Sequence, residues 1–316
     1  MHLTIKKKII IATLLSVLVS TSAIGGLILK SYRDEAKLAG LEQIKIAKEN
    51  FAHLVESDVN MMSATMNALM ENAQLGQLFS QGQRENLYNM ASPLYKQLKD
   101  RYRITHWYFH TLETENKIFL RVHQPANFGD ENKRITYREA IDKKTVASGL
   151  ELGKTAFALR VVAPYAFQGR MIGYIELGEE IDHFLGTLKK QTGYDYGMVI
   201  KKEMLDGQEW AKNREYHNLA NNWDALPTTV LVDKTTENEG LFAEPVTIDT
   251  LPDEGILLGD VKKGDVQFSK GAFPLYDAGH RKVGAVFVLR DITSAYQAMR
   301  FKPLILESRP LIRSFS

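Results

Sequence analysis

Charged side chains sit inside apolar, strand-like segments between residues 119 and 178, rather than at the ends of those segments. Alternation along a strand places Arg121 and His123 on the same face as Phe119. It likewise places Arg160 on the face of the apolar residues that follow it at every second position. Burying such charges without partners is costly, so they need each other or a ligand. The pattern therefore predicts a site that recognises a small molecule.

A small anion suits the basic side chains of these segments. A guanidinium offers a planar fork for a carboxylate, and an imidazole offers a tunable hydrogen-bond donor. We expect Arg160, Arg121 and His123 to contact such an anion, for example a carboxylate. Alternatively, Arg121 forms an internal salt bridge with Glu151 or Glu176. A ligand amine held by either glutamate is a further alternative.

Other polar residues complete the candidate site. Arg138 lies on a short predicted helix that would cover the pocket, and Tyr108 and His110 could line it from the first strand. Asp130 follows a Phe-Gly pair, a setting that is also typical of turn and helix-capping residues. Glu176, in a glycine-flanked strand end, could instead tie a loop. The full set of candidate ligand-binding residues is Arg160, Arg121, His123, Tyr108, His110, Arg138, Glu151, Glu176 and Asp130.

The sequence does not favour metal binding or catalysis. His106, His110 and His123 lack the compact spacing of a metal-ligand motif. There is no G-x-S-x-G elbow, no H-E-x-x-H motif, no phosphate-binding loop and no cysteine nucleophile. With 40 Lys and Arg against 38 Asp and Glu, no basic surplus indicates nucleic acid. We expect a ligand-binding protein that is not an enzyme and has no cofactor and no nucleic-acid partner.

The N-terminal segment predicts attachment to a membrane. Lys6 to Lys8 precede a run from Ile9 to Leu29 without a charge, and about 20 apolar residues suffice to cross a bilayer as a helix. The lysines favour a cytoplasmic N-terminus. A cleavable signal peptide is the competing interpretation, because Thr21 to Ala23 form an acceptable cleavage site. The apolar run continues past that site, which favours an uncleaved anchor.

A long helical region follows the anchor. Apolar residues from Phe51 to Ala73 advance by alternating steps of four and three, which predicts a continuous helical stripe. Residues 80–82 predict a break, and a second helix over 84–99 contains Pro93. We expect the stripe to pack on the domain or on a partner helix. A parallel homodimer through this helix is the second expectation.

The pattern changes to strands after residue 103. Residues 104–111 and 117–124 are rich in aromatic and β-branched residues and predict a hairpin. A short helix over 137–144 precedes strands near 149–151, 155–167 and 171–177, with a turn at 168–170. The prediction is an antiparallel sheet flanked by helices, an α+β fold.

A weaker copy of this order returns near the C-terminus. Residues 266–275, a glycine turn at 277–279 and residues 283–290 repeat the strand, turn and strand seen over 157–176. An internal duplication accounts for the repeat. The sequence thus predicts two stacked modules whose boundary lies in a helix over 180–191.

These motifs resemble those of double Cache sensors, the extracytoplasmic domains of bacterial chemotaxis receptors, sensor histidine kinases and membrane-bound diguanylate cyclases. In one subgroup F-L-R-x-H-x-P-x-x-F-G-D is followed by G-x-E-x-G, an Arg before an apolar-Pro pair, and I-G-x-x-E-x-G. The resemblance covers roughly residues 30–293. The matching residues are Phe119, Leu120, Arg121, His123, Pro125, Phe128, Gly129, Asp130, Gly149, Glu151, Gly153, Arg160, Pro164, Ile172, Gly173, Glu176 and Gly178.

The resemblance implies a long N-terminal helix that supports two PAS-like modules, with the ligand in the membrane-distal one. The expected organisation is a cytoplasmic N-terminus (1–8), a transmembrane helix (9–29), a helical stalk and second helix (30–102), a membrane-distal ligand-binding module (103–188), a membrane-proximal module (189–295) and an irregular tail (296–316). The chain would cross the bacterial cytoplasmic membrane once, with the sensor in the periplasm or outside the cell.

The tail departs from the pattern of the resembled sensors. They continue into a second transmembrane helix and an output domain, whereas residues 301–316 carry charges and prolines that do not suit a span. The expected function is the small-molecule sensor of a signalling receptor that lacks this span and its output domain. The alternative is a membrane-anchored adaptor that passes its ligand state to a separate signalling partner.

Overall fold

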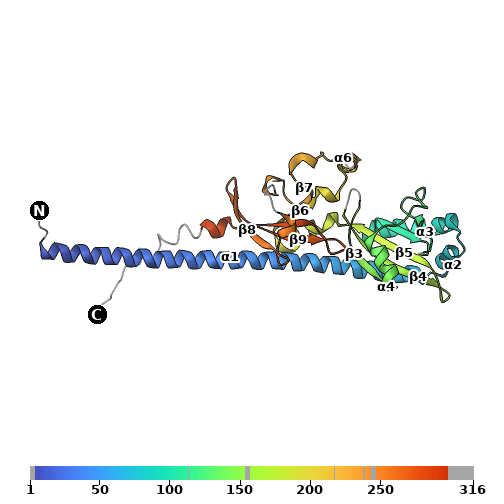
Figure 1. Ribbon diagram of the computed structural model, residues 1–316, viewed down its shortest axis with the longest axis horizontal. Coiled ribbons are helices and arrows are strands. Elements are labelled where there is room, and N and C mark those ends of the chain that lie inside the picture. The colour runs from blue at the N-terminus through green and yellow to red at the C-terminus, as the bar shows by residue number, and fades with distance from the viewer. Residues whose placement is uncertain are drawn as a thin grey trace, which may run out of the picture.

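The computed structural model describes residues 4–112, 114–153, 157–216, 218–237, 239–242 and 247–297. One long helix, α1, forms the spine, and two antiparallel five-stranded sheets lie side by side along its C-terminal part (Figure 1). The helices are α1 (Ile5–Met70), α2 (Ala73–Ser80), α3 (Arg84–Tyr102), α4 (Ile135–Lys143), α5 (Phe184–Thr192) and α6 (Gly207–Tyr216), with short 3-10 helices η1 (Ile181–His183), η2 (Lys202–Met204), η3 (Trp223–Ala225), η4 (Glu239–Phe242) and η5 (Ile248–Thr250). The strands are β1 (His106–His110), β2 (Ile118–Arg121), β3 (Ala147–Leu152), β4 (Phe157–Phe167), β5 (Arg170–Glu180), β6 (Asp195–Lys201), β7 (Thr229–Lys234), β8 (Ile256–Lys263), β9 (Val266–Tyr276) and β10 (Lys282–Asp291).

Helix α1 has two parts with different surroundings. Its N-terminal part contains a segment long and apolar enough to cross a membrane, and the side chains of that segment are exposed. In its C-terminal part the predicted apolar stripe is packed against the sheets, with Phe51, Met62, Met66 and Leu69 buried in the main core. The stripe therefore packs on the modules of its own chain.

The predicted helical stripe is interrupted earlier than the sequence pattern suggests. Helix α1 ends at Met70, and Asn72 begins α2 because its side-chain oxygen accepts hydrogen bonds from the backbone amides of Gln74 and Leu75, both at 3.1 Å. An asparagine at this position satisfies amides that the new helix leaves free. The predicted break near Gly82 is also present, between α2 and α3.

The first sheet has the strand order β2-β1-β5-β4-β3. Trp107, Phe109 and Ile175 face a core shared with α1, α2 and α3, whereas Val162 and Tyr174 pack with α4 on the opposite face. Alternation along the strands thus gives the sheet one thick apolar face and one face with room for polar side chains.

The second sheet repeats the connectivity of the first. Its order is β7-β6-β10-β9-β8, so the five strands of each sheet are arranged in the same way relative to their order in the chain. This agreement supports the repeat predicted from the sequence. The η1 and α5 segment lies between β5, in the first sheet, and β6, in the second. Most of the predicted tail, from residue 298 onward, lies outside the described residues.

Candidate ligand-binding site

Glu176 is the centre of a buried charged cluster on the α4 face of the first sheet. Its side chain, from the middle of β5, is 0 % exposed. Arg160 Nη1 donates to Oε1 at 2.5 Å, Arg134 Nη1 donates to Oε1 at 2.9 Å, and His110 Nε2 lies 2.9 Å from Oε2. We call His110, Arg134, Arg160 and Glu176 the Glu176 cluster.

Strand register explains how these residues meet. Gly178 pairs with Arg160 on one side and with His106 on the other. A Cβ atom at Gly178 would lie 3.4 Å from both Arg160 Nη1 and His106 Cβ, so the Arg160 guanidinium passes close to this glycine on its way to Glu176. Gly178 is the last residue of the I-G-x-x-E-x-G motif that contains Glu176.

The cluster has an excess of positive charge. Burial alone would raise the pKa of Glu176, but the guanidiniums of Arg134 and Arg160 and the His110 hydrogen bond hold that pKa well below its usual value. Burial lowers the pKa of His110, although its bond to Glu176 partly opposes this shift. Two cationic arginines thus face one carboxylate and a neutral histidine. This net positive charge favours the binding of a further anion.

An aromatic platform lies beside the cluster. The Tyr108 ring centroid is 4.5 Å from Arg134 Cζ and 5.7 Å from Arg160 Cζ, and the Tyr108 hydroxyl accepts from Arg134 Nη2 at 2.9 Å. Burial and nearby Arg160 lower the pKa of His106 to about 2, while burial lowers the pKa of His123 to about 4. These rings are neutral, so the arginines carry the charge of the site.

Arg121 has a different partner from the one expected. It binds both carboxylate oxygens of Asp130 at 2.7 Å and also donates to the Asn127 carbonyl at 2.8 Å, and it does not pair with Glu151 or Glu176. The bond from Arg121 lowers the pKa of Asp130. The internal salt bridge predicted for Arg121 exists, but its predicted partners were wrong.

The shared face predicted for Phe119 and Arg121 is also wrong. The pairing of β1 with β2 shifts register between Phe109 and His110, so one residue of β2 is left over. Phe119 packs on Phe79 of α2, with ring centroids 5.4 Å apart, whereas the Arg121 guanidinium lies near Tyr108. A bulge of this kind cannot be recognised from alternation alone.

The remaining predicted residues lie around the cluster. Glu151 accepts bonds from the amide and hydroxyl of Thr136, both at 2.6 Å, and so anchors the first turn of α4. Arg138 is exposed on α4. His123 lies edge to face with Tyr108, at 4.7 Å between centroids. His106, His110 and His123 do not converge as a metal-ligand set among the described residues.

Arg134 is the main site residue that the sequence reasoning missed. It is the residue immediately before α4, which begins two residues earlier than predicted. Its side chain is 23 % exposed, against 6 % for Arg160, so it is the guanidinium of the cluster nearer to solvent. A charged residue just before a predicted covering helix was the available signal.

A separate hollow lies away from the cluster, near the end of β5 and the second module. Its volume is about 380 Å³, and Glu180, Asp182, Trp210 and Asp233 are among its lining residues. Burial raises the pKa of Asp233 to about 6. The hollow lacks convergent arginines, so the Glu176 cluster is the stronger candidate for anion binding.

The profile of the dCache_3 family, the double sensory domain of two-component sensor kinases, matches residues 41–296. The chain belongs to this double Cache family. Among solved structures similar to this double Cache chain are two from Vibrio cholerae. The LuxQ periplasmic domain is 10 % identical, covering 81 % of this chain and 99 % of LuxQ, with a TM-score of 0.45. The DctB sensor domain is 8 % identical, covering 81 % and 98 %, with a TM-score of 0.44.

A third similar structure is a ligand-binding domain in complex with L-valine, from the Campylobacter jejuni chemoreceptor Tlp3. It is 11 % identical to the double Cache chain, covering 81 % of this chain and 95 % of that one, with a TM-score of 0.37. No protein of curated function matches the chain in sequence. The family assignment makes this a double sensory domain, whose two modules are built on the two sheets.

Proposed function

We propose that the chain is a membrane-anchored, non-catalytic sensor that binds a small carboxylate or related anion at the Glu176 cluster, outside the cytoplasmic membrane. The observation that carries the proposal is the pairing of one buried and one partly exposed guanidinium with the same carboxylate beneath α4. Charge taken out of water needs compensation, and the Glu176 cluster itself holds two cations and one anion. The sensory nature of the family supports a ligand as its source.

Arg134 makes the direct contact with the ligand in this proposal. Its guanidinium is partly exposed and lies over Tyr108, and an arginine has donors left for a second carboxylate after it has bound Glu176. Arg160 is almost completely buried and is held by Glu176. It therefore adds positive charge to the proposed site without contacting the ligand directly. The buried Tyr108 ring supports the Arg134 guanidinium and so holds it in position.

Strand β5 provides the route from the ligand to the membrane. Glu176 and Glu179 are three positions apart, so their side chains project from opposite faces of the sheet. Glu176 faces α4, and Glu179 approaches Asp58 on α1. Ligand-driven closure of α4 on the cluster would shift β5 against α1 and favour one of two positions of the spine.

The proposal is tested by thermal unfolding of the full chain in detergent, in the presence of small mono- and dicarboxylates. A ligand at about 100 times its dissociation constant adds roughly 2.7 kcal/mol to the free energy of unfolding. We expect at least one carboxylate to raise the Tm, and Arg134→Ala to abolish that rise. Arg138→Ala is the matched control, because Arg138 is an exposed arginine of α4, the helix that begins directly after Arg134. Loss of binding in Arg138→Ala but not in Arg134→Ala would contradict the assignment.

Glu176→Gln provides a second test that separates charge from shape. Removing the carboxylate leaves two guanidiniums buried without their partner, which costs about 3–5 kcal/mol of stability. Asp130→Asn should cost much less, because Asp130 is 57 % exposed and exposed pairs contribute about 0–1 kcal/mol. We expect carboxylates to stabilise Glu176→Gln more than the wild type, because they replace the missing anion. Equal stabilisation of both proteins would argue against the cluster as the anion site.

A further inference from the structure

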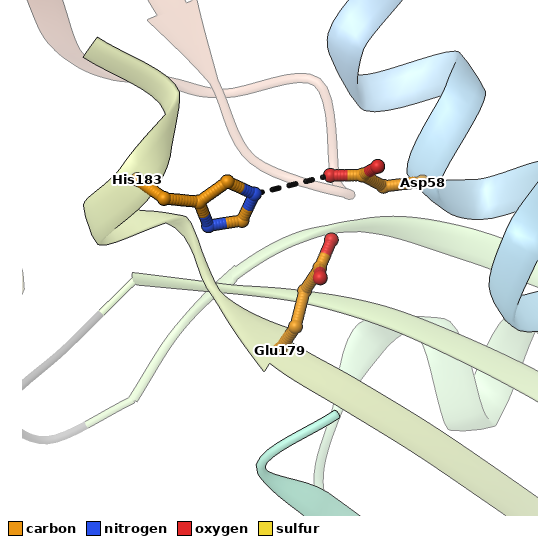
Figure 2. A group of neighbouring side chains, drawn as sticks. All are labelled: Asp58, Glu179 and His183. Carbon is orange, nitrogen blue, oxygen red and sulfur yellow. Dashed lines mark ion pairs between the residues drawn. The ribbon is translucent and has the colours of Figure 1, made fainter. Parts of the chain in front are cut away.

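Three potential metal ligands converge where the first module meets the long helix. Asp58 comes from α1, Glu179 from the end of β5 and His183 from η1, and all three side chains point into one space (Figure 2). One ligand atom from each lies within 4.8 Å of the other two. Asp58 Oδ2 is 3.4 Å from His183 Nε2. None of these residues belongs to the Glu176 cluster.

One buried carboxylate oxygen of Glu179 lacks a hydrogen-bond partner among the described residues. This atom is Oε1, and the residue as a whole is 1 % exposed. A buried carboxylate oxygen in this state is costly, and a bound ion is one of its ordinary explanations. A cation bound between the two carboxylates and the imidazole would supply the missing partner.

The ligand types and spacing select the kind of ion. Ligands about 2.0–2.1 Å from a tetrahedral zinc ion lie about 3.3 Å apart, close to the separation of the Asp58 and His183 atoms. Calcium and magnesium prefer sets of six or more oxygens, including water, and rarely use imidazole. One nitrogen and two carboxylates instead suit a borderline transition metal.

We propose that Asp58, Glu179 and His183 bind a divalent transition-metal ion of the zinc class, which ties α1 to the segment between the two modules. Three protein ligands leave the fourth position to water. The side chains of Asp58 and His183 are 22 % and 19 % exposed, so the ion can reach the site from solvent. The ion would stiffen the contact between β5 and the spine, and it does not depend on a ligand at the Glu176 cluster.

The test is zinc binding by the untagged full chain in detergent, after treatment with a chelator. We expect one zinc ion per chain in competition with a fluorescent chelator, and a rise in Tm on adding zinc that EDTA reverses. Asp58→Asn, Glu179→Gln and His183→Ala should each weaken binding by roughly 10–100-fold or more. His53→Ala is the matched control, since His53 is an exposed histidine of α1 with a side chain 77 % exposed, and it should bind as the wild type does.

If another variant fails to fold, Glu179→Gln still tests the proposal, because it keeps the shape of the side chain and removes the carboxylate that would bind the ion. Cobalt absorption gives an independent readout, and its bands should disappear in this variant. The proposal would be overturned if the wild type bound no zinc, or if all three variants bound it with wild-type affinity. It would also be overturned if zinc and EDTA left every Tm unchanged, because the three residues would then form only an ion pair.

Discussion

Neutral histidines surround the positive charge of the proposed ligand site. His106, His110 and His123 are all on or beside the strands that carry the Glu176 cluster, and burial lowers the pKa of each. An imidazolium at any of these positions would lose its hydration and face the nearby arginines. The arrangement keeps the anion site cationic through guanidiniums alone, so its charge stays constant near neutral pH.

The histidines make stability depend on pH. An unfolded histidine titrates near its ordinary pKa of 6.5, whereas folded His123 titrates at about 4 and folded His106 at about 2. Below pH 6.5 the unfolded state therefore binds protons that the folded state does not. The free energy of unfolding should fall as the pH drops from 7 to 4, by up to about 1.4 kcal/mol per pH unit for each histidine. Glu176 causes a further loss of stability below pH 4.5, its ordinary pKa, because its pKa in the folded state is depressed.

Urea denaturation of the full chain at several pH values, followed by tryptophan fluorescence, measures this slope. Between pH 6 and 4, His106→Gln should reduce the slope of the free energy of unfolding against pH. The reduction should correspond to about one proton taken up on unfolding. His53→Gln should leave it unchanged, because that residue is exposed on α1. A slope that is the same in His106→Gln and the wild type would show that His106 titrates normally.

At the scale of elements, each sheet needs a glycine at the same place. Gly173 in β5 and Gly284 in β10 occupy corresponding positions of the repeat predicted from the sequence. A Cβ atom would lie 2.3 Å from the His110 carbonyl oxygen at Gly173, and 2.1 Å from the Val199 carbonyl oxygen at Gly284. Both contacts are with the backbone of the neighbouring strand, which has little freedom to move. The repeated Val/Ile-Gly pattern thus reflects a close approach of two strands.

Alanine at either glycine should distort its own sheet. We expect Gly173→Ala and Gly284→Ala each to cost about 1–3 kcal/mol or more, the range of overpacking in a filled core. Gly186→Ala is the control, since Gly186 is exposed on α5 and an added Cβ meets nothing within 4 Å. That change should be neutral or stabilise the helix by up to about 1 kcal/mol. Chemical denaturation of the three variants measures the difference, and similar effects at all three positions would contradict the explanation.

At the scale of the whole molecule, α1 packs against both modules of the described structure. Its exposed apolar N-terminal part extends beyond the two modules, and its C-terminal part reaches α2 at the far end of the first module (Figure 1). The first module is therefore the one further from the apolar segment. The proposed ligand site lies in this far module, and the proposed metal site lies where α1 passes between the modules.

Single-cysteine labelling tests the proposed orientation, because the chain has no cysteine of its own. In intact bacterial spheroplasts, a membrane-impermeant maleimide should modify Ala126→Cys, at an exposed position of the first module. Lys7→Cys should react only after lysis, because the lysine cluster places it on the cytoplasmic side. The reverse pattern would contradict the orientation. Absence of residues 1–23 from the intact mass of the purified protein would instead indicate a cleaved signal peptide.

Much of the fold could be predicted because its signals are local. The apolar stripe from Phe51 to Leu69, the strand alternation and the hairpin at Gln168 and Gly169 depend on residues close together in the chain. Both turn residues have a positive φ, as such a hairpin requires. The repeated strand order followed from the repeat in the sequence. The break at Asn72 was missed, because the apolar spacing continues across it.

The sequence by itself determined the apolar N-terminal segment, the spine, the two modules and the presence of charges inside the first sheet. Only the tertiary structure decided which charges meet. Arg121 binds Asp130, Arg134 enters the Glu176 cluster, and Asp58 approaches Glu179. Propensity and periodicity act over a few residues, whereas these contacts depend on strand register and on how a helix packs across a sheet. The chemistry of the two sites is therefore a property of the packing and not of any single segment.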